Sequence, residues 1–411
     1  MAFARQALVA ALLVAACARP EIARVTPAPL SPAPDIRVGV VVGGGSLTIG
    51  GGAPLVLATQ QGGWVGEVPA AGTATVEADE GGLRVRLASG ALSPGASLLI
   101  ATTGGETRVR LDGRDYRGTL TLEFSRGRIT AINVLDLEEY LLGVVGIEMG
   151  LRGETDVAAL QAQAVVSRTI ALQRLGRERD RGYDLLAGVA DQAYAGVGHE
   201  TELAGRAVLE TRGQVLTYQG QVIDAFFHST CAGRTAPGPE VFAAANRPYL
   251  RSISDLDEAG RPWCAISPRY RWREIWTGDD LARTLRQTVP AAGAAADLAA
   301  SLRDVRVLER TGTGRVARLE IQGGTGSLSV TGPVARQVLR TADGSPLRST
   351  DFTLQVTREG ERIVRLIAEG AGAGHGVGMC QWGAIGRARA GFSYRSILST
   401  YFPGTDLSRT Y

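Results

Sequence analysis

Asp136-Leu-Glu-Glu-Tyr-Leu-Leu-Gly-Val-Val-Gly-Ile-Glu-Met149 is the stretch at which this 411-residue chain changes from a β pattern to a helical one. Asp136 is suited to cap the start of a helix, Glu139 completes a capping-box pattern, and Gly150 can end the helix. A second helix is predicted from about Thr155 to Leu175, because good helix formers fill its middle. The small side chains there favour close packing between helices.

β structure is expected on both sides of these helices. Residues 36–130 carry short runs, several of which alternate apolar and polar side chains, between glycine-rich turns; this indicates an N-terminal antiparallel β region. Further strands are predicted at Gln214–Tyr218 and Val222–Phe227. A mixed segment at about 277–368 is expected to hold several strands and one helix, Gly278–Thr288.

The order of the elements decides the fold class. A glycine-rich loop at Gly370–Gly378 and two short helices reaching Tyr401 come near the end of the chain, and strands and helices do not alternate in regular β-α-β order. We therefore expect an α+β fold, in which mixed, mainly antiparallel sheets and a few helices surround a groove, rather than a doubly wound sheet.

The first residues have the pattern of an export signal. Arg5 precedes a short apolar run, Ala7–Ala16, which suits a secretory signal peptide and is too short to span a membrane. Small residues directly before Cys17 resemble a bacterial lipobox, which implies cleavage before Cys17 and a lipid on its sulfur. A plain signal peptide with an incidental cysteine is the alternative. Residues 18–35 form a proline-rich spacer, so we expect an exported protein anchored by lipid to the extracytoplasmic or periplasmic face of the cell envelope.

Charge and cysteine content limit the partners. The 44 basic residues, all arginine, nearly balance 41 acidic ones, and the net charge of +3 argues against nucleic acid as a partner. If Cys17 carries lipid, Cys231, Cys264 and Cys380 remain, an odd number for an exported protein. They are compatible with a disulfide plus a free thiol, or with a structural zinc site of the Cys₃His type that uses a histidine as well.

Glu148 is the most informative residue of the first helix. Leu141, Val144 and Val145 form an apolar stripe at helical spacing, and Glu148 falls on that stripe. Burial disfavours the charged carboxylate and raises its pKa, so that the group can donate a proton near neutral pH. The alternative is a structural ion pair with Arg152 or Arg168 at the end of the helix.

Two of the three histidines lie in distinctive loops. His228 follows a strand-like run, and His375 lies among glycines that let a ligand approach the backbone closely. The alternative is that both loops are tight structural turns. His199 is expected on the surface. A nucleophilic pair of Cys380 with His375 is disfavoured, because no acid that could orient it is evident.

Six segments, taken in order, match the motifs of one known family. They are Glu138–Met149, Ala158–Thr169, Phe227–Thr235, Pro248–Ser252, Ser267–Trp272 and Gly374–Ala384. Together, over roughly Arg117 to Tyr411, they resemble the stage II sporulation protein D / amidase enhancer (SpoIID/LytB) family. The resemblance implies that residues 131–411 form a catalytic domain around a substrate groove. It also implies a lytic transglycosylase that cuts peptidoglycan glycan strands.

The resemblance assigns roles to individual residues. Glu148 corresponds to the catalytic glutamate of the family's Glu-Met-Pro motif, although Gly150 stands where the family usually has proline, and glycine loosens a helix end. Substrate-contacting positions of the family correspond to Gln163, Arg168, His228, Ser229, Thr230, His375 and Gln381. Relatives keep both histidines where the cysteines are absent, which favours substrate contact for the histidines and a separate structural role for the cysteines.

A lytic transglycosylase needs only one carboxyl group and no cofactor, because the sugar's own 6-hydroxyl is the nucleophile. Two other functions remain open at this point. One is a non-catalytic peptidoglycan-binding module that activates a partner cell-wall amidase. The other is a zinc hydrolase built on His228, His375 and the cysteines.

Overall fold

The computed structural model describes residues 32–103, 108–188 and 190–411. The expected signal peptide, the lipobox with Cys17 and nearly all of the spacer lie outside the described residues and stay predictions. Among the helices of the described ranges, none combines the length and the apolar character needed to cross a membrane.

The N-terminal β region consists of two sheets. One sheet has the strand order β13 (Leu185–Leu186), β1 (Asp35–Gly44), β12 (Arg128–Asp136), β11 (Thr119–Ser125), β8 (Ser97–Thr102), β3 (Leu55–Ala58) and β4 (Trp64–Val68). The other has the order β10 (Arg114–Arg117), β9 (Arg108–Leu111), β2 (Ser46–Gly50), β5 (Thr73–Asp79), β6 (Gly82–Leu87) and β7 (Gly90–Gly95). Every neighbouring pair in these two sheets is antiparallel except β1 with β13.

The alternation of side chains explains why these strands form two layers. In β11, Leu120 and Leu122 are fully buried, and in β6 the same is true of Val85. Strands of one sheet contact strands of the other, so the buried faces meet in a shared apolar core. The predicted antiparallel β region is therefore confirmed, and the fold class is α+β.

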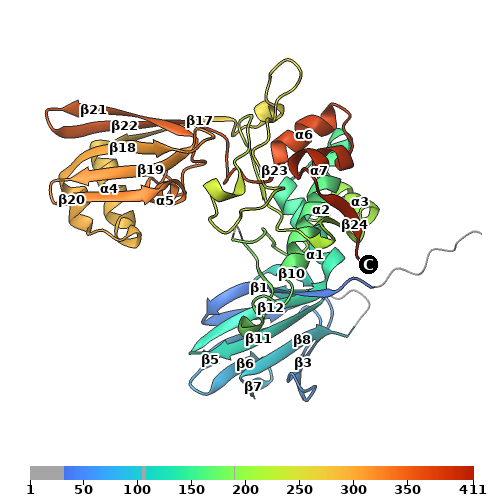
Figure 1. The fold of residues 1–411 in the computed structure, drawn as a ribbon. Helices are drawn as coiled ribbons and strands as arrows, with labels where there is room; N and C mark the ends of the chain where they lie inside the picture. The colour runs from blue at the N-terminus through green and yellow to red at the C-terminus, as the bar shows by residue number, and fades with distance from the viewer. Residues whose placement is uncertain (1–31, 104–107, 189) are drawn as a thin grey trace, which may run out of the picture. The chain divides into compact units, whose positions relative to one another are not determined.

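A group of helices follows, with α2 at its centre. α1 (Leu137–Met149) begins at Asp136, whose carboxylate accepts hydrogen bonds from the N–H groups of Glu138 and Glu139, as predicted for an N-cap. α2 (Val157–Arg174) follows a short 3₁₀ turn and contacts the helices α1, α3 (Glu202–Glu210), α6 (Gln381–Arg389) and α7 (Tyr394–Tyr401) (Figure 1). Its buried alanines allow this close packing, as expected.

Three strands line this helical group. β14 (Gln214–Tyr218) has the predicted bounds and pairs with β15 (Gln221–Val222) and β24 (Asp406–Arg409). The predicted strand Val222–Phe227 is wrong in its middle, because the backbone leaves β15 and enters β16 (Phe227–His228) only afterwards. Between them, the N–H of Asp224 donates to the hydroxyl of Tyr249 instead of to a neighbouring strand.

β16 brings two distant loops together. It pairs in parallel with β23 (Met379–Cys380), with Phe227 opposite Met379 and His228 opposite Cys380. A bridge between Thr230 and Ala373 continues the contact. The loop that carries His228 and the glycine-rich loop that carries His375 therefore lie side by side.

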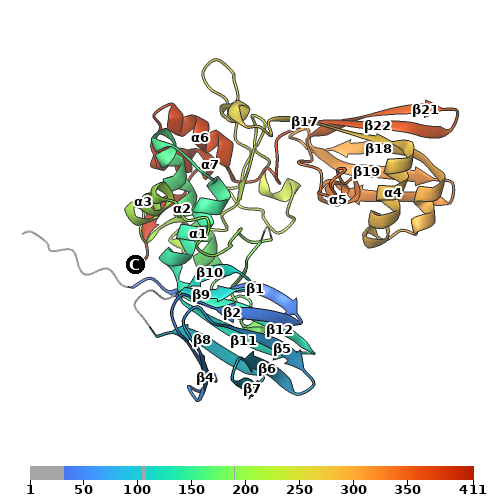
Figure 2. The ribbon, with the colours of Figure 1, turned by 180° about the vertical axis from the view of Figure 1, so that it is seen from behind.

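The mixed segment has a hydrophobic core of its own. Its strands and helices are drawn in Figure 2. Its two sheets have the orders β17 (Arg271–Thr277), β22 (Arg362–Ala371), β21 (Phe352–Glu359) and β18 (Leu302–Arg310), β19 (Val316–Gly323), β20 (Gly326–Thr331). The predicted helix is α4 (Gly278–Thr288), and its bounds are confirmed. A second helix, α5 (Gly332–Val338), was not predicted, because a helix with Pro333 and only two turns gives little periodic signal.

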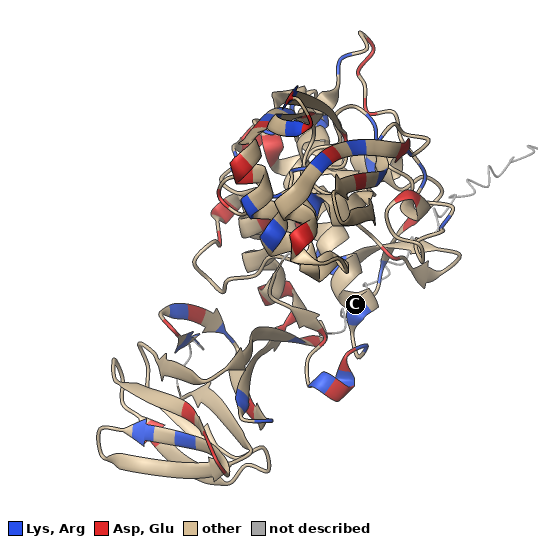
Figure 3. Ribbon diagram, turned by 90° about the vertical axis from the view of Figure 1, so that its left-hand side faces the viewer, with Lys and Arg blue, Asp and Glu red and all other residues tan. Residues whose placement is uncertain are grey.

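Acidic and basic positions are interspersed along the helices and strands (Figure 3). Many of them form exposed pairs, such as Arg86 with Glu77 and Arg306 with Glu320. Pairs of this kind add little to stability individually. The buried or unpaired charges are therefore more informative about function.

Candidate active site

Glu148 lies in the last turn of α1, on the buried stripe predicted for it. Leu141, Val144 and Val145 are fully buried, whereas Glu148 itself is half-buried. Its Oε1 accepts a hydrogen bond of 2.7 Å from the N–H of Ala193. Burial raises the pKa of Glu148, and the hydrogen bonds from Ala193 and Gln381 only partly offset that rise.

Gly150 ends α1 in a conformation that proline cannot adopt. Its φ is +66°, in the left-handed region, and its N–H donates to the carbonyl oxygen of Gly146 at 2.9 Å. Proline has φ near −65° and no N–H. A proline at position 150 could therefore neither adopt this conformation nor donate this hydrogen bond.

No arginine in the described ranges forms an ion pair with Glu148. Arg168 pairs with Glu138 at 2.7 Å, and the guanidinium of Arg152 lies over the ring of Trp382, 4.8 Å from its centre. The alternative that Glu148 pairs with Arg152 or Arg168 is wrong. The reason is that Arg168, in the middle of α2, lies beside the first turn of α1 and not beside its last.

His228 and His375 face each other, with ring centres 5.6 Å apart. The Nδ1 of His228 donates to the carbonyl oxygen of Val377 at 3.1 Å, and its Nε2 has no hydrogen-bond partner among the described residues. The Nδ1 of His375 instead accepts from the N–H of Val377 at 3.1 Å. Because a carbonyl only accepts and an N–H only donates, the two neutral rings carry their protons on different nitrogens.

Both histidines are held neutral. Burial lowers the pKa of His228 well below its ordinary value, and the neighbouring His375 and Arg315 add to that effect. Burial also lowers the pKa of His375 to about 4, assisted by Arg336 and Arg315 and opposed by a hydrogen bond with the backbone of Phe227. Neutral His228 therefore keeps one buried acceptor nitrogen, Nε2, without a partner among the described residues.

Gln381 links the glycine-rich loop to the end of α1. Its Nε2 lies 3.3 Å from the backbone oxygen of Glu148 and 3.3 Å from Oε1 of Gln163. Gln163 in turn donates to the hydroxyl of Ser167 at 3.0 Å. Gln163 is fully buried, and its hydrogen bond therefore holds the amide of Gln381 in position.

One cavity of about 1180 Å³ collects most of the predicted site residues. The predicted residues that line it are Glu148, His228, Ser229, His375 and Gln381. This volume exceeds that of a typical small-molecule pocket. The carboxyl group and both histidine loops therefore share one cleft.

Three predicted substrate contacts lie outside the lining of this cavity: Gln163, Arg168 and Thr230. Arg168 is fully buried, and its guanidinium donates to both oxygens of Glu138 and to backbone carbonyls of Val208 and Gln214. The hydroxyl of Thr230 bonds that of Ser267 at 2.8 Å. In this structure these side chains hold neighbouring elements together, and their contact with substrate stays a prediction. His199 is exposed, as predicted.

The cavity also contains arginines that the sequence did not single out. Seven arginines line it: Arg152, Arg174, Arg177, Arg247, Arg269, Arg315 and Arg336. Arg174, Arg177 and Arg247 pair with aspartates. Among the described residues, Arg315 and Arg336 have no carboxylate partner, and burial together with Arg315 lowers the pKa of Arg336. This part of the cavity therefore carries uncompensated positive charge.

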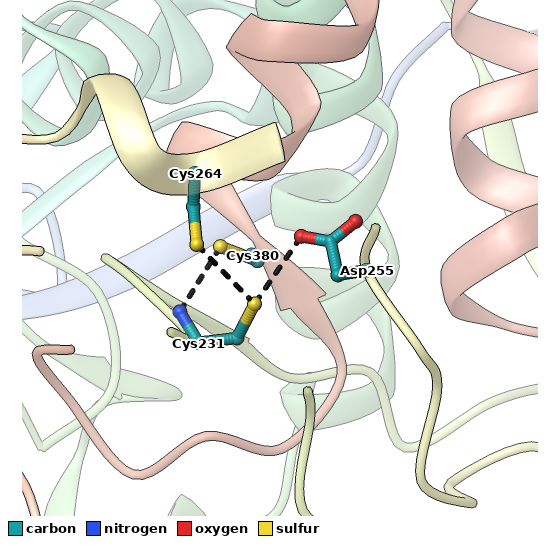
Figure 4. A group of neighbouring side chains, drawn as sticks. All are labelled: Cys231, Asp255, Cys264 and Cys380. Carbon is teal, nitrogen blue, oxygen red and sulfur yellow. Dashed lines mark hydrogen bonds between the residues drawn. The ribbon is translucent and has the colours of Figure 1, made fainter. Parts of the chain in front are cut away.

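The three cysteines are free and buried (Figure 4). The Sγ atoms of Cys231 and Cys264 lie 3.6 Å apart, which is too far for a disulfide. The fourth donor group beside them is Asp255, whereas the expected Cys₃His set would have used a histidine. The two motif histidines bond the backbone of Val377 instead. This arrangement gives no support to a zinc hydrolase built on the histidines.

Comparison with known proteins gives two family matches. Residues 125–218 match the family model described as stage II sporulation protein (SpoIID). Residues 264–378 match a domain of unknown function, DUF8618, which corresponds to the mixed segment with its separate core. Glu148 and α2 lie within the first match, and Arg315, Arg336 and His375 lie within the second.

Curated relatives extend the similarity beyond these two ranges. An uncharacterized protein of Brachyspira hyodysenteriae is 28% identical over 301 residues, which is 72% of this chain and 73% of that protein. Stage II sporulation protein D of Bacillus subtilis is 29% identical over 293 residues, 68% of this chain and 76% of the relative. The amidase enhancer of Bacillus subtilis is 28% identical over 370 residues, covering 80% of this chain but only half of the relative.

Proposed function

Because this chain belongs to the SpoIID/LytB family, whose function is related to the cell wall, we propose that it is a peptidoglycan lytic transglycosylase. In this proposal it cleaves the bond between N-acetylmuramic acid and N-acetylglucosamine in glycan strands. Glu148 is the single acid and base. The product carries a 1,6-anhydro bond.

One observation carries the proposal: Glu148 is a partly buried carboxyl group that pairs with no cation of the described ranges, and it opens into the cavity that both histidine loops line. A carboxyl group that stays protonated near neutral pH is a competent general acid. The C-terminal end of α1 adds to this effect, since a helix C-terminus disfavours negative charge.

The reaction balances with one carboxyl group. Glu148 gives its proton to the oxygen that leaves C1 of N-acetylmuramic acid, and the C1–O bond breaks. The 6-hydroxyl of the same sugar then bonds to C1, and its proton returns to the Glu148 carboxylate. An intramolecular nucleophile is favoured by proximity, and no second carboxylate is needed.

The unpaired arginines suit the charge of this substrate. A glycan strand stripped of its peptides carries a carboxylate on each muramic acid. Arg336 from α5 and Arg315 directly before β19 line the cavity near His375, and neither has an acidic partner in the part of the chain that the structure describes. We place that carboxylate beside these two guanidinium groups, because charge-assisted contacts to carboxylates are the stronger class of hydrogen bond.

The direct test is product analysis by mass spectrometry on purified sacculi, with and without pretreatment by an amidase that removes the stem peptides. The wild-type chain should release anhydro products, and Glu148→Ala, shown to be folded by circular dichroism, should release none. The alkaline limb of the wild-type pH profile should lie above the ordinary range of a glutamate, because activity needs the protonated acid and the pKa of Glu148 is raised. Anhydro product from folded Glu148→Ala would remove Glu148 from this role.

A non-catalytic role is favoured by one comparison: the alignment with the amidase enhancer covers 80% of this chain. A module of that kind would bind glycan and stimulate a partner amidase without cleaving the strand. Glycan binding and strand scission, measured separately, distinguish the two functions. Binding without any scission would favour the activator.

Export and lipid anchoring through Cys17 remain part of the proposal. Their support is the apolar run and the small residues before Cys17, and a substrate outside the cytoplasm requires export in any case. Cys17→Ser should shift the protein from the membrane fraction to the soluble fraction of the envelope.

A further inference from the structure

Four buried donor groups converge beside the candidate active site. The three Sγ atoms of Cys231, Cys264 and Cys380 and one carboxylate oxygen of Asp255 all lie within 4.8 Å of one another (Figure 4). Each of these residues is at most 1% exposed. Arg387 pairs with Asp255 at 3.0 Å, and this ion pair compensates one buried negative charge.

The distances fit a tetrahedral metal better than a disulfide. With Zn–S bonds of about 2.3 Å, two sulfur ligands of a tetrahedral site lie roughly 3.8 Å apart. The Sγ atoms of Cys231 and Cys264 lie 3.6 Å apart, and the Sγ of Cys231 lies 3.2 Å from Oδ2 of Asp255. A disulfide would need about 2.0 Å and would leave the third thiol and the carboxylate without a function.

The surrounding groups orient the donors. Oδ1 of Asp255 accepts from Nε and Nη2 of Arg387, at 3.2 and 3.0 Å, and from the hydroxyl of Tyr401 at 2.9 Å. Its other oxygen, Oδ2, is thereby directed to the thiols. The Sγ of Cys380 accepts from the N–H groups of Cys231 and Gly383, each at 3.2 Å. Outer groups of this kind are typical of metal sites.

We propose that Cys231, Cys264, Cys380 and Asp255 bind one Zn²⁺ in a closed, four-coordinate structural site. Three thiolates, a carboxylate and Zn²⁺ together carry negative charge, which Arg387 and the N–H groups partly balance. Thiolate-rich tetrahedral sites select zinc among the common divalent ions of this size. The full set of four protein ligands leaves no position for a reacting water.

The position of the proposed zinc site indicates its structural role. Cys231 follows His228 on one loop, Cys380 directly precedes Gln381, and Cys264 lies in the 3₁₀ turn Trp263–Ile266, which contacts α6. A metal bonded to all three would fix the loop of His228 to the start of α6. It would thus hold one wall of the cavity in place without touching the substrate.

The test is the zinc content of the full chain, purified in reducing buffer that has been freed of trace metals. We expect about one zinc per chain, and replacement by Co²⁺ should give the intense visible absorption of tetrahedral cobalt with thiolate ligands. Cys264→Ser and Asp255→Asn should each weaken zinc retention against a competing chelator by at least about tenfold. Asp257→Asn is the matched control, since Asp257 is bonded within its own surface turn and should leave zinc retention unchanged.

A measurement on the wild-type chain keeps the proposal testable if the variants fail to fold. Removing zinc with a chelator should lower the thermal midpoint, and adding zinc should restore it. Absence of zinc together with an intact mass that shows a disulfide would overturn the proposal, as would a Cys264→Ser chain that keeps its zinc at wild-type affinity.

Discussion

The two ends of α1 each place a glutamate against the interior, and the two glutamates meet opposite surroundings. Glu138 in the first turn forms a bidentate pair with the fully buried Arg168, and the N–H of Gly213 adds a further bond at 3.2 Å. Glu148 in the last turn accepts from the N–H of Ala193, its pKa is also lowered by the Gln381 side chain, and it has no cation among the described residues. A buried carboxylate with a counter-charge stays ionised, whereas burial without a counter-charge raises the pKa of the carboxyl group.

The largest effect expected from this contrast is on catalysis. Glu148→Gln keeps the shape of the side chain but removes the transferable proton, so the release of anhydro products should fall by about a thousandfold or more. Its stability should stay near that of the wild-type chain, because an amide still accepts from Ala193. Glu138→Gln is the matched control on the same helix: it should lower stability while the folded fraction keeps its activity. Equal loss of activity in both variants would contradict the assignment of catalysis to Glu148 and of a structural role to Glu138.

The next effect is on stability. Arg168→Met leaves Glu138 buried without a cation and should lower the free energy of unfolding by about 3–5 kcal/mol. The double variant Arg168→Met/Glu138→Leu removes the uncompensated charge and should recover most of this loss. Chemical denaturation, followed by circular dichroism, measures both. If Arg168→Met alone unfolds at the wild-type denaturant concentration, the ion pair is not what anchors the first turn.

Helical periodicity predicts the burial of Glu148 from the sequence, but it does not predict the ion pair between Glu138 and Arg168. Glu148 could be placed on the buried stripe because helical spacing fixes which side chains share a face. Arg168 could not be assigned to Glu138, because spacing within α2 says nothing about which turn of α1 lies opposite. The same limit applies to Asp255, which lies in an irregular loop and reaches the thiols only through the tertiary fold.

The fold was predictable to a similar degree. The bounds of α4 and β14 follow from strong local patterns, and the bounds of α2 are two residues shorter at one end and one at the other than the pattern indicated. Helix α3 was not predicted, although Thr201 caps it, because Gly205 in its middle weakens the helical signal. The predicted strand at Val222–Phe227 is interrupted because Tyr249 takes the N–H of Asp224, a contact that local sequence does not encode.

A smaller effect concerns the histidines that face the cavity of Glu148. Burial holds the pKa of His375 at about 4, so the folded chain binds fewer protons than the unfolded chain between about pH 4 and 6.5. Stability should therefore fall as the pH is lowered through this window, by about 2 kcal/mol at pH 5 for this group. The raised pKa of Glu148 acts in the opposite direction. Denaturation of His375→Gln across the same pH range isolates the histidine, and its curve should be the flatter of the two.

The smallest effect concerns substrate binding. It tests whether the arginines of the cavity that have no acidic partner among the described residues bind the negatively charged substrate. Arg336 has a backbone bond from its Nε to the carbonyl oxygen of Leu347 and no carboxylate partner in the described part of the chain. Arg336→Gln should raise the KM for peptide-free glycan by about tenfold, the loss of one charge-assisted contact of roughly 1.4 kcal/mol. Binding of uncharged chitin oligosaccharides should change little, because they lack the muramic acid carboxylate. Equal weakening for both ligands would mean that Arg336 shapes the cavity wall and does not recognise charge. Arg315 would then be the only one of these two arginines left to bind the carboxylate of the substrate.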